Sequence, residues 1–227
     1  MIQLLKKIWP IEILSLQAFQ HLYQQSEVLM AGKRGARLLQ DQNTIHKIFM
    51  PRNGFSSNQF WPYAIRFYQN SHQLIKRGIT APLVDRLAFF PDNQYYIVRY
   101  QKIRGIDCRN YLQIHSLNIL QQLAHFLAEL HSKGIFFRGI HLGNILYQAE
   151  SNGFALIDLT GCHFSWRALS LHKRLRNLKH LLNHPDDQHY FLNYGHDLFL
   201  QEYCAKAELP RWKQKIIVNK LNSICKN

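Results

Sequence analysis

Short apolar stretches between turn residues fill much of the first half of the chain, which is the pattern of a strand-rich unit. Residues 27–52, EVLMAGKRGARLLQDQNTIHKIFMPR, predict three strands separated by a glycine turn and a polar turn. Residues 82–103 predict two more strands around a Pro-Asp-Asn turn. Residues 61–79 carry apolar side chains at helical spacing and stop at a glycine, so a helix is expected there. A short helix is also predicted over residues 14–25.

The second half of the chain has mostly helical patterns. Residues 116–134 predict an amphipathic helix that ends at a glycine. Residues 145–159, ILYQAESNGFALIDL, predict a hairpin with an Asn-Gly turn, and helical patterns continue from about residue 165. The order favours an α+β protein with a small β-rich lobe over residues 27–100 and a larger helical lobe over residues 101–227.

One pair of oxygen ligands stands out around the predicted hairpin. Asn144 precedes the first hairpin strand and Asp158 follows the second, so pairing of the strands brings the two side chains together. An amide oxygen and a carboxylate are hard ligands that suit Mg²⁺ and leave room for phosphate and water. In the alternative interpretation, Asn144 caps a turn and Asp158 only ends a strand by accepting hydrogen bonds from backbone amides.

Two features of the first half fit phosphate binding. Lys47 lies between apolar residues of a predicted strand, where a cation is costly unless it meets an anion. Gly32 and Gly35 flank a turn that could let the backbone approach phosphates. The alternatives are an edge-strand lysine that points to water and a glycine pair that marks only a hairpin.

The order of a strand lysine, FRGIHLGNIL and LIDLTG resembles the protein-kinase-like fold. Within that fold, GIFFRGIHLGNILY followed by ALIDLTG is similar to the lipopolysaccharide core kinases (Kdo and heptose kinases) and the related bacterial "toluene tolerance" proteins. The resemblance implies a single domain over residues 1–227 and an ATP- and Mg²⁺-dependent transferase. It assigns phosphate binding to Lys47 and metal binding to Asn144 and Asp158. It also implies a sugar hydroxyl of a lipopolysaccharide core, or of a related envelope glycolipid, as the acceptor.

The sequence departs from the kinase pattern at two places. Gly139 occupies the position of the catalytic-loop Asp, five residues before Asn144, and no acid lies between Asp41 and Asp85 to supply the usual helix partner of Lys47. His141 could accept the proton of the acceptor hydroxyl, or it could only bridge the loop to Asp158. Both departures keep a second hypothesis open: a pseudokinase that binds nucleotide or a partner and regulates an envelope pathway without phosphoryl transfer.

The charge of the chain affects which partners are expected. There are 28 Lys and Arg residues against 14 Asp and Glu, a formal net charge of +14. This surplus fits an anionic acceptor and peripheral contact with the inner membrane. A basic helix is predicted over residues 171–182. On it, we expect Arg174 and Arg176 either to contact such an acceptor or to form a solvated face. Nucleic acid is not favoured, because no RNA- or DNA-binding module is recognised.

The cysteines and the apolar runs bear on the compartment. The four cysteines are too far apart in sequence for a CxxC site; they are Cys108, Cys162, Cys204 and Cys225. The simplest inference is that the protein is in a reducing compartment. No stretch approaches the roughly 20 apolar residues of a membrane span. A cytoplasmic location is therefore expected.

Overall fold

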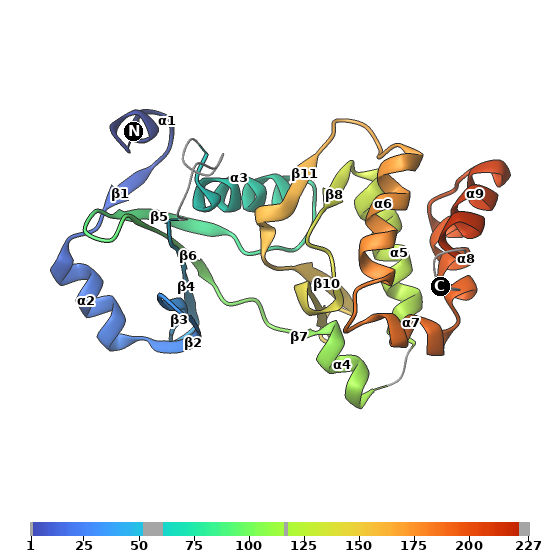
Figure 1. Cartoon of the computed structure of the whole chain (residues 1–227), viewed down its shortest axis with the longest axis horizontal. Helices are drawn as coiled ribbons and strands as arrows, with labels where there is room; N and C mark the ends of the chain where they lie inside the picture. The colour runs from blue at the N-terminus through green and yellow to red at the C-terminus, as the bar shows by residue number, and fades with distance from the viewer. Residues whose placement is uncertain (1, 52–60, 116–117, 223–227) are drawn as a thin grey trace. The chain divides into compact units, whose positions relative to one another are not determined.

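The computed structural model describes residues 2–51, 61–115 and 118–222. The chain divides into two compact units, Met1–Ile103 and Arg104–Asn227. Figure 1 labels helices and strands of both units. The elements of the first unit are α1 (Ile2–Ile8), β1 (Ile11–Ile13), α2 (Leu16–Gln25), β2 (Glu27–Gly32), β3 (Gly35–Asp41), β4 (Thr44–Phe49), α3 (Tyr63–Lys76), β5 (Val84–Phe90) and β6 (Tyr95–Gln101). All the strands and helices predicted for residues 14–103 are confirmed.

The first unit is built on a six-stranded sheet with the order β1-β5-β6-β4-β3-β2. Strands β2 to β6 pair with antiparallel neighbours, whereas β1 lies parallel to β5, with Ile11 opposite Leu87. The strand β1 was not predicted, because three residues are too short to show a period. The sheet carries Lys47 on β4, opposite Leu38 of β3 and Val98 of β6.

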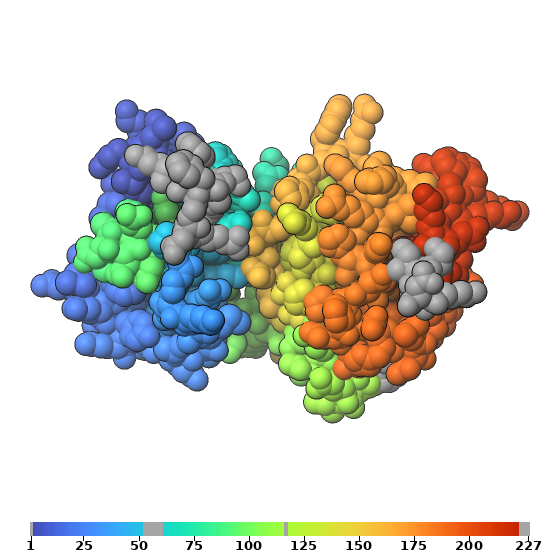
Figure 2. All heavy atoms as spheres, viewed as in Figure 1, coloured from blue at the N-terminus to red at the C-terminus, as the bar shows by residue number. Residues whose placement is uncertain are grey.

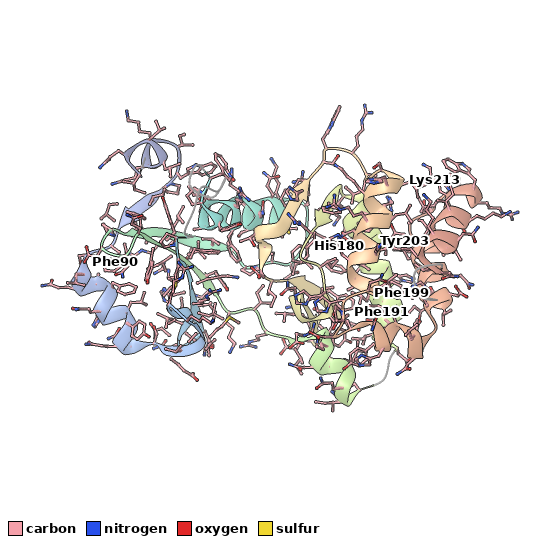
Figure 3. The ribbon with its side chains drawn as sticks, viewed as in Figure 1. Phe90, His180, Phe191, Phe199, Tyr203 and Lys213 are labelled. Carbon is pink, nitrogen blue, oxygen red and sulfur yellow. The ribbon has the colours of Figure 1, made fainter. Side chains whose placement is uncertain are left out.

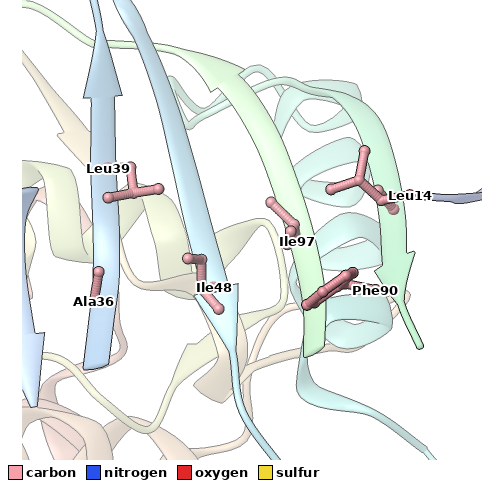
Figure 4. Packing of buried hydrophobic residues seen from close by; sticks show 7 residues of the cluster. Leu14, Ala36, Leu39, Ile48, Phe90 and Ile97 are labelled. Atoms are coloured by element: carbon pink, nitrogen blue, oxygen red, sulfur yellow. The ribbon is translucent and has the colours of Figure 1, made fainter. Parts of the chain in front are cut away.

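Each face of this sheet is covered by a helix. On one face a core cluster forms, and Phe19 of α2 stacks on Phe90 with 4.3 Å between ring centroids. Figure 4 shows the buried residues of this cluster and labels Leu14, Ala36, Leu39, Ile48, Phe90 and Ile97. On the other face, α3 buries a second apolar row against β5 and β6, formed by Ala64, Ile65, Phe67 and Leu74. The alternation of the strands therefore places Ile48 and Lys47 on opposite faces.

The second unit is mostly helical. Its elements are β7 (Ile106–Asp107), α4 (Cys108–Ile114), α5 (Ile119–Ser132), β8 (Ile135–Phe137), the 3-10 turn η1 (Leu142–Asn144), β9 (Ile145–Gln148), β10 (Gly153–Leu156), the 3-10 turn η2 (Leu159–Gly161), β11 (Cys162–Phe164), α6 (Leu171–Leu182), α7 (Gln188–Tyr194), α8 (His196–Lys206) and α9 (Arg211–Asn222). The helix α5 is buried along most of its length and packs against α8. The predicted helix and hairpin are confirmed, and Asn152 takes the left-handed conformation that its turn needs, with φ 50°.

Two small sheets of the second unit hold the loops around the candidate site. The strands β7, β9 and β10 form one sheet, while β8 pairs with β11. Gly134 joins α5 to β8 with φ +74°, and a Cβ there would lie 2.3 Å from the carbonyl oxygen of Ser165. Only glycine allows this close approach, which fixes the start of β8 and hence of the loop that follows it.

Three of the four cysteines, Cys108, Cys162 and Cys204, are buried free thiols, and Cys225 lies outside the described residues. No helix in the described part of the chain is long and apolar enough to cross a bilayer.

Candidate active site

The loop after β8 is anchored at its start by Asn177 of α6. The Asn177 Oδ1 atom accepts a hydrogen bond from the Phe137 backbone N–H at 3.3 Å, and its Nδ2 donates to the Phe137 carbonyl at 2.7 Å. Both backbone groups of Phe137 are buried, so they need such partners. One side chain thus fixes the backbone two residues before Gly139.

Asn177 is itself held by a buried chain of hydrogen bonds from α6, α8 and α5. Arg174 donates from Nη1 to the Tyr203 hydroxyl at 2.9 Å, and Tyr203 lies 2.7 Å from Nδ1 of His131. His131 Nε2 lies 3.0 Å from Asn177 Oδ1. Because the amide oxygen can only accept, we assign the proton of His131 to Nε2, and Tyr203 then donates to Nδ1. The hydrogen bonds from Arg174 through Tyr203 and His131 to Asn177 therefore all run in one direction, toward the loop.

The electrostatics of this chain agree with a neutral imidazole. Burial lowers the pKa of His131 to about 3; the bond to Asn177 opposes this shift and the charge of Arg174 adds to it. Burial also raises the pKa of Tyr203 to about 12, against the influence of Arg174. Both groups are therefore uncharged at neutral pH, and each keeps the proton that the hydrogen-bond chain requires.

A second anchor holds the middle of the loop from the segment between α6 and α7. Asp187, which is fully buried, accepts a hydrogen bond at Oδ2 from the Leu142 backbone N–H at 2.7 Å. Its Oδ1 accepts from Nε of Arg109 at 2.6 Å, and Arg109 also contacts Asp186 at 3.2 Å. A buried carboxylate needs both a countercharge and hydrogen bonds, and here it obtains them from α4 and from the loop.

Asn144 and Asp158 lie next to each other beyond this anchor. Asn144 Nδ2 donates to the Gly139 carbonyl at 2.9 Å, and the Asn144 carbonyl accepts from the Ile157 N–H at 3.0 Å. Asp158 follows in the left-handed conformation, with φ 54°, and makes no side-chain capping bond to the turn η2. The hairpin therefore brings the two predicted ligands to one end of the β9–β10 sheet.

The oxygen atoms of Asn144 and Asp158 are suitable ligands for a hard divalent cation. With Nδ2 turned to Gly139, the amide oxygen of Asn144 is the atom left for a ligand, and Asp158 supplies a carboxylate from an exposed position. No group of three or more His, Cys, Asp or Glu side chains that could hold a metal is found in the described parts of the chain. A magnesium ion here would thus complete its shell with phosphate oxygens and water.

His141 lies in the same loop as Asn144, and its ring lies close to that of His184. The two imidazole rings are 4.7 Å apart between centroids, and Nδ1 of His141 is buried without a hydrogen-bond partner in the described structure. Burial lowers the pKa of His141, the charges of His184 and Arg109 act in the same direction, and those of Asp187 and Asp158 oppose them. The neutral ring that results is the form that can accept a proton.

The space around Gly139 is large enough for a side chain, although the loop has no acid at this position. A Cβ atom there would meet its nearest neighbour, Cε2 of Phe137, at 3.4 Å and Asn144 Nδ2 at 3.8 Å, which are ordinary contacts. Gly139 is also not among the glycines with positive φ. The position can therefore take a side chain without strain.

The predicted phosphate-binding residues lie in the first unit. The Lys47 ammonium is 5.2 Å from the ring centroid of Phe67 on α3 and 5.6 Å from that of Phe49. An aromatic ring of α3 thus makes a cation–π contact with the lysine, and α3 itself contains no acidic residue. Gly32 and Gly35 pair with each other across the two-residue turn between β2 and β3, and Gly35 has φ +110°.

The sequence did not predict the two anchors of the loop, Asn177 and Asp187, and the expectation for Arg174 was wrong. Arg174 is only 4% exposed and donates to the Leu169 carbonyl and to Tyr203, so the expectation that it contacts an acceptor is wrong. The buried side of α6 has the spacing of a core stripe, formed by Arg174, Asn177, Leu178, Leu181 and Leu182. That spacing was the signal that could have separated Arg174 from Arg176.

Comparisons with known proteins agree with this geometry at the level of the fold. No family model matches the chain, and no curated protein matches it. Among solved structures, WaaP in complex with acyl carrier protein matches with a TM-score of 0.55 and 15% identity over 90% of this chain and 91% of that one. The chain has a protein-kinase-like fold.

Two other solved structures match less well. A monomeric WbdD structure has a TM-score of 0.48 and 18% identity, over 82% of this chain and 44% of that chain. The Cydia pomonella granulovirus kinase PK-1 has a TM-score of 0.39 and 15% identity, over 66% of this chain and 56% of that chain. The fold resemblance therefore depends on WaaP, and it confirms the predicted α+β, protein-kinase-like fold.

Proposed function

We propose that this protein is an ATP- and Mg²⁺-dependent kinase that phosphorylates a sugar hydroxyl of a lipopolysaccharide core or a related envelope glycolipid. The observation that carries the proposal is the orientation of Asn144, whose amide nitrogen is bound to Gly139 while its oxygen is left for a ligand next to Asp158. The acceptor class comes from the resemblance of the loop strings to lipopolysaccharide core kinases. The net charge of +14 suits such an anionic acceptor at the inner membrane.

The roles follow from the chemistry of phosphoryl transfer. Asn144 and Asp158 would hold a magnesium ion, which would supply charge neutralisation on the transferred phosphate. The resemblance assigns phosphate binding to Lys47, and the turn between Gly32 and Gly35 would let its backbone approach phosphates. His141, kept neutral by burial, accepts the proton of the attacking hydroxyl. Because the transition state is loose, positioning and charge neutralisation contribute more than the strength of the base.

The test uses Asp158→Ala on the full chain. Binding of Mg²⁺-ATP is measured by calorimetry, and transfer is followed with radiolabelled ATP and a glycolipid fraction from envelopes. We expect loss of Mg²⁺-dependent binding and of transfer, with little change in thermal stability, because Asp158 is exposed. If Asp158→Ala binds Mg²⁺-ATP with unchanged affinity, Asp158 is not a ligand of the metal.

A pseudokinase is the second candidate, and two observations favour it. Gly139 leaves the loop without its acid, and α3 contains no acidic residue. Such a protein binds nucleotide or a partner and regulates an envelope pathway. Mg²⁺-ATP binding without transfer to any glycolipid fraction would decide for the pseudokinase.

A further inference from the structure

Cationic side chains gather around Phe136, immediately before the candidate loop. The Arg176 guanidinium lies 5.8 Å from the Phe136 ring centroid, and the His180 ring lies 6.4 Å from it in an edge contact. His180 also forms a hydrogen bond with the backbone of Arg138, the residue before Gly139. Two elements, the loop and α6, thus bring their basic side chains to one place. Figure 3 labels His180 on α6.

These cations differ from the others around the loop. Arg109 is paired with Asp187 and Asp186, and Lys133 with Glu129. For Arg138, Arg176 and Lys179 no ion pair is found with any described residue, and all three side chains are exposed. Side chains of α6, drawn in orange, form part of the surface seen in Figure 2.

The neighbours of His180 show that the cluster lacks a negative charge. Burial lowers the pKa of His180, the bond to Arg138 opposes this shift, and the charges of Arg176, Arg138 and Lys179 add to it. The charged side chains that lower the pKa of His180 are therefore all cations. Like charges held this close favour binding of an anion, and arginine with lysine is the combination that binds phosphate.

We propose that Arg138, Arg176, Lys179 and His180 form a binding site for a phosphate monoester carried by the acceptor, with Phe136 as its apolar floor. The proposal rests on the proposed kinase function, and it specifies the acceptor as a sugar that already carries a phosphate. The site begins one residue before Gly139, so a phosphate bound there holds the rest of the acceptor close to His141 and Asn144. Binding of the remote phosphate would thereby orient the reacting hydroxyl.

The same chemistry could come from a sugar phosphate or from a lipid headgroup, and two probes separate these sources. Glucose 6-phosphate is titrated into the full chain at low salt, with glucose as the uncharged comparison, and binding is followed by the NMR signals of the His180 ring. Binding to vesicles that contain phosphatidic acid is measured by sedimentation. Neither measurement needs nucleotide, so both are independent of phosphoryl transfer.

The variant Arg176→Glu/Lys179→Glu tests the site, and Lys206→Glu/Lys215→Glu is its matched control. Both variants change the net charge by the same amount, and Lys206 and Lys215 are exposed residues of α8 and α9. We expect the first variant to weaken glucose 6-phosphate binding by about 10-fold or more, because two charge-assisted bonds become repulsive. The affinity of the control variant for glucose 6-phosphate should fall much less. Circular dichroism and thermal unfolding establish that both variants fold.

The outcomes separate the anion site from the kinase function. Selective loss of glucose 6-phosphate binding in Arg176→Glu/Lys179→Glu supports the site. Equal loss in both variants, or none in either, overturns it. Selective binding to the vesicles without binding of glucose 6-phosphate also overturns it, because the ligand would then be a lipid headgroup. Selective sugar-phosphate binding by a protein that transfers no phosphate supports the site and overturns the kinase function.

Discussion

The carboxylate of Asp187 lies 2.7 Å from the backbone nitrogen of Leu142, although the two residues are 45 positions apart in sequence. Asp187 is fully buried, and its other oxygen is paired with Arg109. Leu142 lies between His141 and Asn144, so this bond fixes the backbone that carries both candidate catalytic side chains. Asp187 thus acts as a positioning residue for the loop.

Replacing Asp187 by Asn should lower both stability and turnover. The amide removes the charge that compensates Arg109, so we expect a loss of about 1–3 kcal/mol in the free energy of unfolding. Transfer should fall roughly 10-fold through kcat, since misplaced groups lose orientation while ATP still binds. Denaturant unfolding and steady-state kinetics measure the two effects. The exposed neighbour variant Asp186→Asn is the control, and equal effects of both variants would argue against the anchor.

Restoring the loop acid should raise activity. Gly139→Asp places a carboxylate at the position of the catalytic-loop Asp, and the space around a Cβ there is sufficient. A positioned base contributes about 10²–10⁴-fold in many enzymes, but a loose transition state reduces this, so we expect roughly a 10-fold gain. Gly139→Asn adds similar bulk without a base. A rate that does not differ between the two variants would show that a carboxylate here is not useful.

The sequence predicts the local part of this architecture well and the long-range part poorly. The β9–β10 hairpin is local, with Asn152 in its turn and Gly153 opposite Gln148, so the sequence predicts that Asn144 and Asp158 lie at the same end of the hairpin. The Asn177–Phe137 and Asp187–Leu142 bonds join residues 40 and 45 positions apart, and a single sequence has no period that marks them. The burial of Arg174 was missed because a run of basic residues suggested a solvated helix, while tertiary packing decided its orientation.

The lysine environment gives another prediction. Phe67→Leu removes the ring that faces the Lys47 ammonium but retains an apolar side chain of similar reach. Cation–π contacts contribute about 0.5–2 kcal/mol, so Mg²⁺-ATP affinity should fall by roughly 2- to 30-fold. Because Phe67 is fully buried, stability should also fall, by about 1 kcal/mol. Leu74→Met on the same helix is the control for the packing change. Calorimetry in which Phe67→Leu and Leu74→Met bind ATP equally would contradict a role of the ring.

The buried imidazole of His131 makes stability depend on pH. Its pKa is lowered to about 3 in the folded protein, whereas in the unfolded chain it is near the ordinary imidazole value of 6.5. Between these two values the unfolded state binds the extra proton, so the stability that neutral His131 contributes is present above about pH 6.5 and is lost as the pH falls toward 3. The slope from this one group is at most about 1.4 kcal/mol per pH unit.

His131→Gln should be less stable at pH 7, and its stability should fall less steeply with acid than that of the wild type. Urea unfolding of both proteins between pH 7 and pH 4 gives the two slopes, with His189→Gln, at an exposed position, as the control. Parallel slopes for the wild type and His131→Gln would mean that His131 is not the neutral member of the hydrogen-bond chain that orients the loop.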